Sequence, residues 1–152
     1  MIDWYKKAVF ENYANFSGRA RRSEFWYFIL CNFTITFLLY ALLFTLLAIS
    51  GSIEEERNKG IMVIFSVLAW GIIPLYSLAV FIPNLAVFVR RLHDTGKSGW
   101  TLLVYFIPLV GLILLIVWLA SDSQPGSNQW GPNPKETDDS INEIGNDLIE
   151  RY

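Results

Sequence analysis

Residues 25–50 read FWYFILCNFTITFLLYALLFTLLAIS, a long apolar run that contains no charged side chain. Two further uncharged apolar runs follow at 61–89 and 100–120. An α-helix needs about 20 residues to cross a hydrocarbon core of about 30 Å, and all three runs reach that length. A soluble domain would instead scatter charged side chains along each amphipathic element. The sequence therefore predicts an all-α membrane protein, a bundle of three transmembrane helices spanning about 25–50, 61–89 and 100–120.

The positions of Lys and Arg predict how these helices are oriented. With three crossings, eight basic residues share one side with the amino terminus and four lie on the other. By the positive-inside rule, the amino terminus is then cytoplasmic and the carboxy terminus lies outside. An alternative makes 61–89 a re-entrant hairpin broken at Pro74 or Pro83, which gives a seven-to-five split and a cytoplasmic tail. Three crossings are favoured because the charge bias is larger and because half of the second run is too short to cross.

Residues 1–24 are predicted to form a cytoplasmic amphipathic segment that ends in a basic motif. Aromatic and small apolar residues recur there at three- and four-residue steps, so an amino-terminal amphipathic helix would lie with one aromatic face in the membrane interface. Residues 16–26 then read FSGRARRSEFW, with three arginines beside the first apolar run. Near an anionic leaflet each of them contributes about 1 kcal/mol of attraction. In the simpler interpretation, this basic flank only orients the first helix.

A second polar motif lies in the link before the third apolar run. Residues 89–100 read VRRLHDTGKSGW, and the predicted topology brings them to the same face as the first arginine cluster. Guanidinium groups match phosphate oxygens, so the two motifs together predict a site for a lipid headgroup, a phosphorylated ligand or a protein partner. Alternatively, Asp94 and Glu24 pair with the arginines and lock the helices together. The candidate site residues are Arg19, Arg21, Arg22, Glu24, Arg90, Arg91, His93, Asp94 and Lys97.

No catalytic or metal-binding pattern accompanies these motifs. His93 is the single histidine, and no Ser or Cys nucleophile motif stands with it. Cys31 is the single cysteine, so no intramolecular disulfide forms, and these two residues cannot supply the three or four ligands of a zinc site. We therefore expect a protein that is not an enzyme, with no cofactor, no metal and no nucleic-acid partner.

The motifs resemble those of a known family. The pattern F-x-G-R-x-R-R-x-E-F-W at 16–26 is followed by R-R-L-H-D-x-x-x-S-G-W at 90–100 and by N-x-x-G-x-N-P at 128–134. This combination is similar to that of the domain-of-unknown-function 805 family of small bacterial inner-membrane proteins. The resemblance covers about residues 4–134. It implies a multi-pass protein of the bacterial inner (plasma) membrane, and it carries no activity because the family has none assigned.

Residues 121–152 form a turn-rich and acidic tail. Its first part is rich in Pro, Gly, Ser and Asn, which favour turns. From Ser140, a capping pattern with Glu143 precedes apolar residues at helical spacing and predicts a short amphipathic helix. The acidic residues beyond 134 lie outside the family resemblance.

Two classes of function agree with this pattern. The first is a non-enzymatic membrane module that binds anionic lipid headgroups or a membrane protein partner through its basic cytoplasmic face, or that forms a homo-oligomer. The second is a small transporter or channel component. Ion pathways are usually marked by charged residues inside the membrane, and the three runs contain none. Their polar residues Asn32 and Asn84 are explained equally well by hydrogen bonds between helices. The sequence favours the module.

Overall fold

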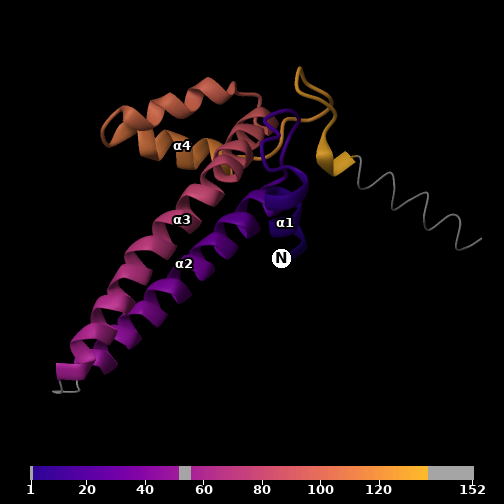
Figure 1. Ribbon diagram of the computed structural model, residues 1–152. Helices are drawn as coiled ribbons and strands as arrows, with labels where there is room; N and C mark the ends of the chain where they lie inside the picture. The colour runs from indigo at the N-terminus through magenta and orange to yellow at the C-terminus, as the bar shows by residue number, and fades with distance from the viewer. Residues whose placement is uncertain (1, 52–55, 137–152) are drawn as a thin grey trace, which may run out of the picture.

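The computed structural model describes residues 2–51 and 56–136, and every regular element within these ranges is helical. Two long helices form an antiparallel pair, and the shorter elements gather at one end of it (Figure 1). The elements are α1 (Ile2–Lys6), the π-helical turn η1 (Lys7–Glu11), α2 (Arg22–Gly51), α3 (Glu56–Asp94), the 3₁₀ helix η2 (Gly99–Phe106) and α4 (Val110–Ala120). The helix predicted to begin at Ser140 lies outside the described residues.

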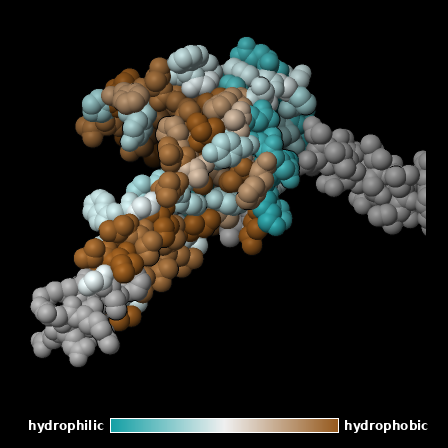
Figure 2. Space-filling model, in the orientation of Figure 1, coloured by the Kyte–Doolittle hydropathy of each residue, from teal (hydrophilic) through white to brown (hydrophobic). Residues whose placement is uncertain are grey.

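Helices α2 and α3 are long and apolar enough to cross a membrane. The most apolar 18-residue windows of the segments Arg22–Ile49 and Ser66–Asp94 have a mean hydropathy of 2.1, and only 11% and 22% of the residues in these windows, respectively, are buried. The core helix of a soluble protein would be mostly buried, whereas these helices turn their apolar side chains outward. Figure 2 shows this surface as a hydrophobic column that ends in a hydrophilic patch. The first two predicted spans therefore correspond to two outward-facing apolar helices.

Helix α3 continues through Pro74 and Pro83. Each proline removes one backbone hydrogen bond, but the bonds of the neighbouring turns hold the helix together. The alternative in which 61–89 forms a re-entrant hairpin is therefore wrong.

The third apolar run folds as a hairpin, and the prediction of one helix over 100–120 is wrong. The chain reverses between η2 and α4 at Pro108, which disfavours helical backbone in the residue before it. Ile107 is accordingly extended, with φ −83° and ψ 111°, and Leu109 has a φ of 64°. The two legs pack so closely that a Cβ on Gly111 would lie 1.9 Å from the Val104 carbonyl oxygen. With about 2.0 Å and 1.5 Å of rise per residue, each leg is about 16 Å long, which is about half of a 30 Å hydrocarbon core.

The reversal returns the chain to the carboxyl end of α3. Arg91 Nε donates to the Leu119 carbonyl oxygen at 3.0 Å, and the backbone N–H of Gln124 donates to that of Asp94 at 2.8 Å. Asp122 then forms an ion pair with Arg22, at the start of α2, at 2.9 Å. Three crossings had placed the tail opposite Arg22, so that placement is wrong for residues 121–136.

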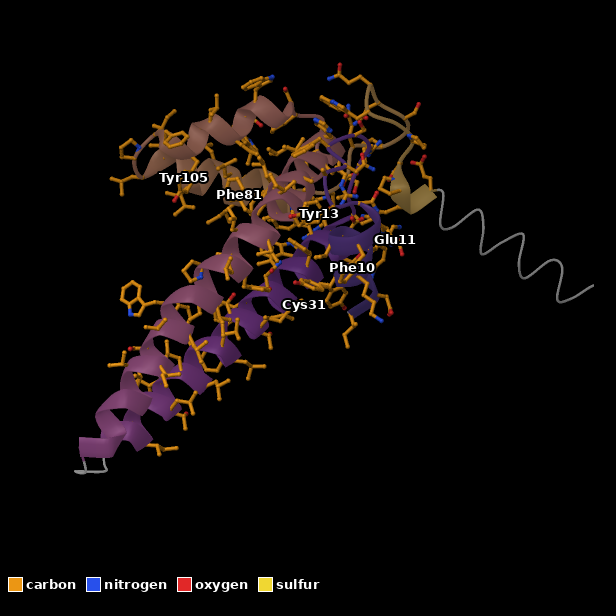
Figure 3. The ribbon with its side chains drawn as sticks, viewed as in Figure 1. Phe10, Glu11, Tyr13, Cys31, Phe81 and Tyr105 are labelled. Carbon is orange, nitrogen blue, oxygen red and sulfur yellow. The ribbon has the colours of Figure 1, made fainter. Side chains whose placement is uncertain are left out.

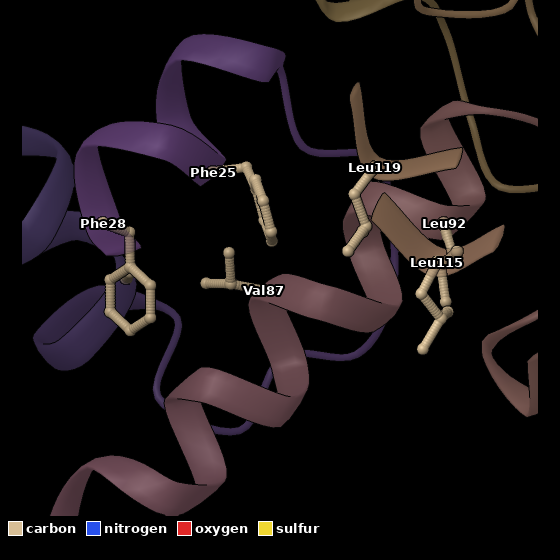
Figure 4. Close-up of a cluster of buried hydrophobic side chains, with 7 residues drawn as sticks. Phe25, Phe28, Val87, Leu92, Leu115 and Leu119 are labelled. Atoms are coloured by element: carbon tan, nitrogen blue, oxygen red, sulfur yellow. The ribbon is translucent and has the colours of Figure 1, made fainter. Parts of the chain in front are cut away.

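A small apolar core joins these elements beside the polar patch. Its buried side chains come from η1, α2, α3 and α4, and most of them are labelled in Figure 4. Phe25 packs edge-on against Phe88 with 5.0 Å between ring centroids. The members of the core are Ala8, Phe25, Phe28, Val87, Leu92, Leu115 and Leu119. Because all of them lie at one end of the long helices, the core fixes the segments that carry the candidate site.

The amino-terminal residues pack onto the helix pair. Tyr5 stacks on Phe28 with 5.7 Å between ring centroids, and Tyr13 Oη donates to the Ala79 carbonyl oxygen at 2.7 Å. Phe10, which is labelled in Figure 3, remains 77% exposed. The aromatic side chains of this segment are thus divided between packing on the protein and facing outward.

Polar groups between the long helices are hydrogen-bonded to one another. Tyr76 Oη of α3 donates to Asn32 Oδ1 of α2 at 2.8 Å and lies 3.2 Å from Tyr5 Oη. This chain joins three elements, as the interhelical interpretation of Asn32 predicted.

Candidate functional site

The two sequence motifs meet where residues 17–21 cross the carboxyl end of α3. The backbone N–H of Ala20 donates to the Arg90 carbonyl oxygen at 3.1 Å, and His93 Nδ1 lies 3.2 Å from the Gly18 carbonyl oxygen. Gly18 has a φ of 84°, a conformation that residues with a Cβ rarely adopt. The glycine of the first motif therefore lets the chain turn onto the second motif.

A Schellman motif ends α3 and turns the chain toward the tail. The N–H of Lys97 donates to the Leu92 carbonyl oxygen at 2.9 Å, and the N–H of Gly96 donates to that of His93 at 3.0 Å. Gly96 has a φ of 76°, and a Cβ there would lie 2.7 Å from Gln124 Oε1. The turn thus brings residues 121–136 against the end of the helix.

Asp94 lies at the centre of a buried ionic cluster. Its carboxylate accepts from Arg19 Nε at 3.0 Å, from Ser123 Oγ at 2.6 Å and from Arg91 Nη1. The side chains of Arg19, Arg91 and Asp94 are at most 1% exposed. Buried charges are tolerated only when they are paired and hydrogen-bonded, and these three satisfy that condition.

Backbone carbonyls take up the remaining donors of these two arginines. Arg19 Nη1 donates to Gly126 O at 2.7 Å, and its Nη2 donates to Gln124 O. Arg91 donates from Nε to Leu119 O and from Nη2 to Ser121 O. Every guanidinium nitrogen of both residues therefore has an acceptor. The structure therefore shows the alternative in which Asp94 pairs with arginines of both motifs and joins the two segments.

Arg90 forms a second buried pair, which is much less complete. Its Nη1 lies 2.9 Å from Glu24 Oε1, and both side chains are 6% exposed. The alignment is not that of a hydrogen bond, so Glu24 Oε1 has no hydrogen-bond partner, nor have Arg90 Nε and Nη2. A buried polar group without a partner costs about 1–3 kcal/mol. Arg90 is therefore the least satisfied charged group described at this end of the molecule.

Arg90 borders a polar cavity of about 260 Å³ between the amino-terminal segment and the helix ends. Among the residues that the structure describes around it, Lys7, Arg19, Arg21 and Arg90 are basic and Glu24 is acidic. The remaining lining residues are Trp4, Asn12, Asn15, Ser17, Gly18 and Pro134. Among the described lining residues, basic side chains therefore outnumber acidic ones.

Arg22 and Lys97 lie outside both clusters. Arg22 is at the surface, where it pairs with Asp122. This pairing lowers the pKa of the Asp122 carboxyl, and Lys135 makes a second, smaller contribution in the same direction. The Lys97 ammonium lies over the Trp118 ring, 4.8 Å from its centroid. The nine candidate residues are thus divided among a buried lock, a cavity and the surface.

His93 is held in place by the tail. Its ring stacks on Trp130 with 4.4 Å between centroids and an angle of 9°, and its carbonyl oxygen accepts from Asn128 Nδ2 at 2.9 Å. Its side chain also borders an apolar groove of about 490 Å³ along α3 and η2. Among the described residues, no three His, Cys, Asp or Glu side chains converge as metal ligands would.

The sequence did not identify several groups that complete these clusters. Lys7 reaches the cavity from the amino-terminal segment, and Ser123 and Asp122 reach the lock and the surface pair from the tail. The family pattern at 128–134 was the available signal, because its Asn128 donates to the His93 carbonyl oxygen of the second motif. Trp130, at an unspecified position within that pattern, stacks on the His93 ring.

Comparison with known proteins places all nine candidate residues inside one matched region. The model of a family described as a protein of unknown function (DUF805) matches residues 13–132. The chain is 40% identical over 134 residues to the inner membrane protein YhaH of Escherichia coli K12, covering 88% of this chain and 98% of that protein. It is 38% identical to the inner membrane protein YhaI of the same strain, covering 88% of this chain and 97% of that protein. No solved structure matches.

Proposed function

Because this chain belongs to the DUF805 family, whose relatives YhaH and YhaI are inner membrane proteins, we propose that it is a non-enzymatic inner-membrane module that binds anionic lipid through its polar face. The polar face consists of residues 2–24, 90–97 and 121–136, which meet at one end of the helix pair.

The proposed topology has two crossings and a half-depth hairpin. Helices α2 and α3 cross the membrane, and η2 with α4 enters it from the side of the polar face and returns. Of the twelve Lys and Arg residues, only Arg57 and Lys59 then lie on the far side, at the start of α3. This distribution is more biased than that of the three-crossing topology, so the positive-inside rule supports a cytoplasmic polar face with both termini on that side.

The observation that carries the proposal is the position of the basic groups relative to the apolar ones. Lys7 and Arg21 line the cavity at the helix ends and Arg22 begins α2. At this end of the helix pair the hydrophobic surface gives way to a hydrophilic patch (Figure 2). At this depth a basic side chain lies beside the phosphates of the cytoplasmic leaflet, and each contributes about 1 kcal/mol of attraction to anionic lipid.

The test is the lipid that accompanies the purified protein. We expect protein extracted from native membranes in mild detergent to retain phosphatidylglycerol and cardiolipin in excess over phosphatidylethanolamine, relative to the bulk lipid extract, as measured by mass spectrometry. The double variant Lys7→Gln and Arg21→Gln should lose at least half of that excess. The matched double variant Arg57→Gln and Lys59→Gln, which removes the same charge on the far side, should keep it.

Retention of lipid in bulk proportions would contradict the proposal. A stoichiometric protein that co-purifies with wild type and is lost from the Lys7 and Arg21 variant would instead assign the polar face to a protein partner.

A further inference from the structure

We propose that the cavity beside Arg90 is a binding site for a phosphate group, held by the Arg90 guanidinium with help from Lys7 and Arg21. This inference rests on the proposed function for its first expected ligand, the phosphate of an anionic phospholipid. The chemistry is the same for a soluble phosphate compound, and binding measurements with both kinds of probe separate the two sources.

The first argument compares the three buried arginines. Arg19 and Arg91 use all of their guanidinium nitrogens, toward Asp94 and toward backbone carbonyls. Arg90 is almost as deeply buried, at 6% side-chain exposure, yet its Nε and Nη2 have no acceptor. These two groups carry the desolvation cost of burial without a compensating bond. A ligand oxygen would supply what the protein does not.

The second argument is the geometry of the unpaired donors. Nε and Nη2 form one edge of the planar guanidinium, and this edge presents two parallel N–H groups. Such a fork matches two oxygens of one phosphate. The Glu24 carboxylate stands at Nη1 instead, so it orients the guanidinium without occupying the fork.

The third argument is the charge and size of the cavity. Among the described lining residues, Lys7, Arg21 and Arg90 are basic, whereas Glu24 is acidic. A volume of about 260 Å³ is many times the ~10–15 Å³ that one water needs. The cavity therefore has room for a phosphate together with the group attached to it. Arg90 Nε and Nη2 are buried, so a ligand reaches them only when side chains that line the cavity change rotamer. Lys7, one of these side chains, is exposed and is free to do so.

The fourth argument concerns the source of the phosphate. Trp4 also lines the cavity, and its ring lies 5.3 Å from the Lys7 ammonium. Tryptophan favours the headgroup layer, so this wall of the cavity belongs at the depth of lipid phosphates. A phospholipid headgroup is accordingly the expected occupant.

The experiment titrates the full chain in a neutral detergent and measures binding by calorimetry. The probes are a short-chain phosphatidylglycerol, a short-chain phosphatidylcholine, inorganic phosphate and glycerol 3-phosphate. We expect phosphatidylglycerol to bind at least tenfold more tightly than phosphatidylcholine. Arg90→Lys keeps the charge but removes the fork, and it should weaken phosphatidylglycerol binding at least tenfold. Arg57→Gln is the matched control, because it removes an arginine at the start of α3, at the end of the helix pair away from the cavity, and it should change binding less than twofold.

Folding is checked for each variant by gel filtration and by the melting temperature in the same detergent. If Arg90→Lys does not fold, Lys7→Gln and Arg21→Gln provide the test at less buried positions, each with at least a threefold loss of affinity.

The possible outcomes separate this site from the proposed function. Native lipid enrichment that persists in folded Arg90→Lys would overturn the phosphate site while leaving the proposed function in place. Binding of glycerol 3-phosphate or inorganic phosphate that depends on Arg90, without lipid enrichment in wild type, would support the site and overturn the lipid function. Equal binding of every probe to wild type and Arg90→Lys would overturn the site.

Discussion

Arg19 Nε lies 3.0 Å from Asp94 Oδ1, although 75 residues separate the two in sequence. This bond joins the segment before the first long helix to the end of the second. Both side chains are buried, so the apolar core beside them and the ion pair stabilise the same junction. The junction, the hairpin and the topology can each be tested by substitution.

Replacing Asp94 should destabilise the fold strongly. Asp94→Asn leaves the Arg19 and Arg91 guanidinium groups buried without a counter-charge, and breaking a buried pair costs about 3–5 kcal/mol. We expect a large fall in the melting temperature in detergent. Asp122→Asn, at an exposed carboxylate, should change it little. Similar melting temperatures for the two variants would show that the cluster does not stabilise the fold.

A methyl group at Gly111 should disrupt the hairpin. In Gly111→Ala the new Cβ meets the Val104 backbone carbonyl, which cannot move aside as a flexible side chain can. We expect a loss of about 1–3 kcal/mol, in the range of overpacked cores, and faster proteolysis near residues 107–109. The control is Gly71→Ala in α3, where nothing lies within 4 Å of the new methyl group.

Topology can be read by accessibility of single cysteines in a Cys31→Ala background. Cysteines introduced at Ser17 and Ser127 should react only with a reagent that reaches the cytoplasm, because both lie on the polar face. A cysteine at Lys59 should react from the periplasm. Labelling of position 127 from the periplasm would restore the three-crossing topology and contradict the half-depth hairpin.

Acid should loosen the start of the tail. The pKa of Asp122 is lowered from 3.8, chiefly by Arg22 and then by Lys135. A carboxyl group with a lowered folded pKa stabilises the fold above its unfolded pKa, and this contribution is lost as the pH falls through the folded value. The protection factors of residues 121–124, which compare the observed exchange rate with the intrinsic rate at the same pH, should therefore fall below about pH 4 in wild type. In Asp122→Asn the protection factors should be lower already at neutral pH, with a smaller additional change in acid.

The sequence predicted the two long helices because an uncharged run of that length leaves few alternatives in lipid. It also predicted that the two arginine motifs meet, since both flank the same ends of those helices. It failed at 100–120, because the hydropathy of this stretch is the same whether it forms one long helix or a hairpin of two short helices. The sequence signal for the reversal was Pro108.

The different roles of the arginines could not be read from the sequence either. Arg90 and Arg91 are adjacent and chemically identical, but successive residues on a helix point about 100° apart. Arg91 consequently faces Asp94 and the returning hairpin, whereas Arg90 faces Glu24 and the cavity. Only the packing of the amino-terminal segment and the tail distinguishes them.

The short legs of the hairpin give the molecule a tapered outline in the proposed topology. Four helical rods stand in the inner half of the bilayer, and only two continue through the outer half. The protein is therefore wider in the cytoplasmic half of the bilayer than in the outer half. Many copies together would curve the membrane so that its cytoplasmic face is convex, and they would be depleted from regions of the opposite curvature.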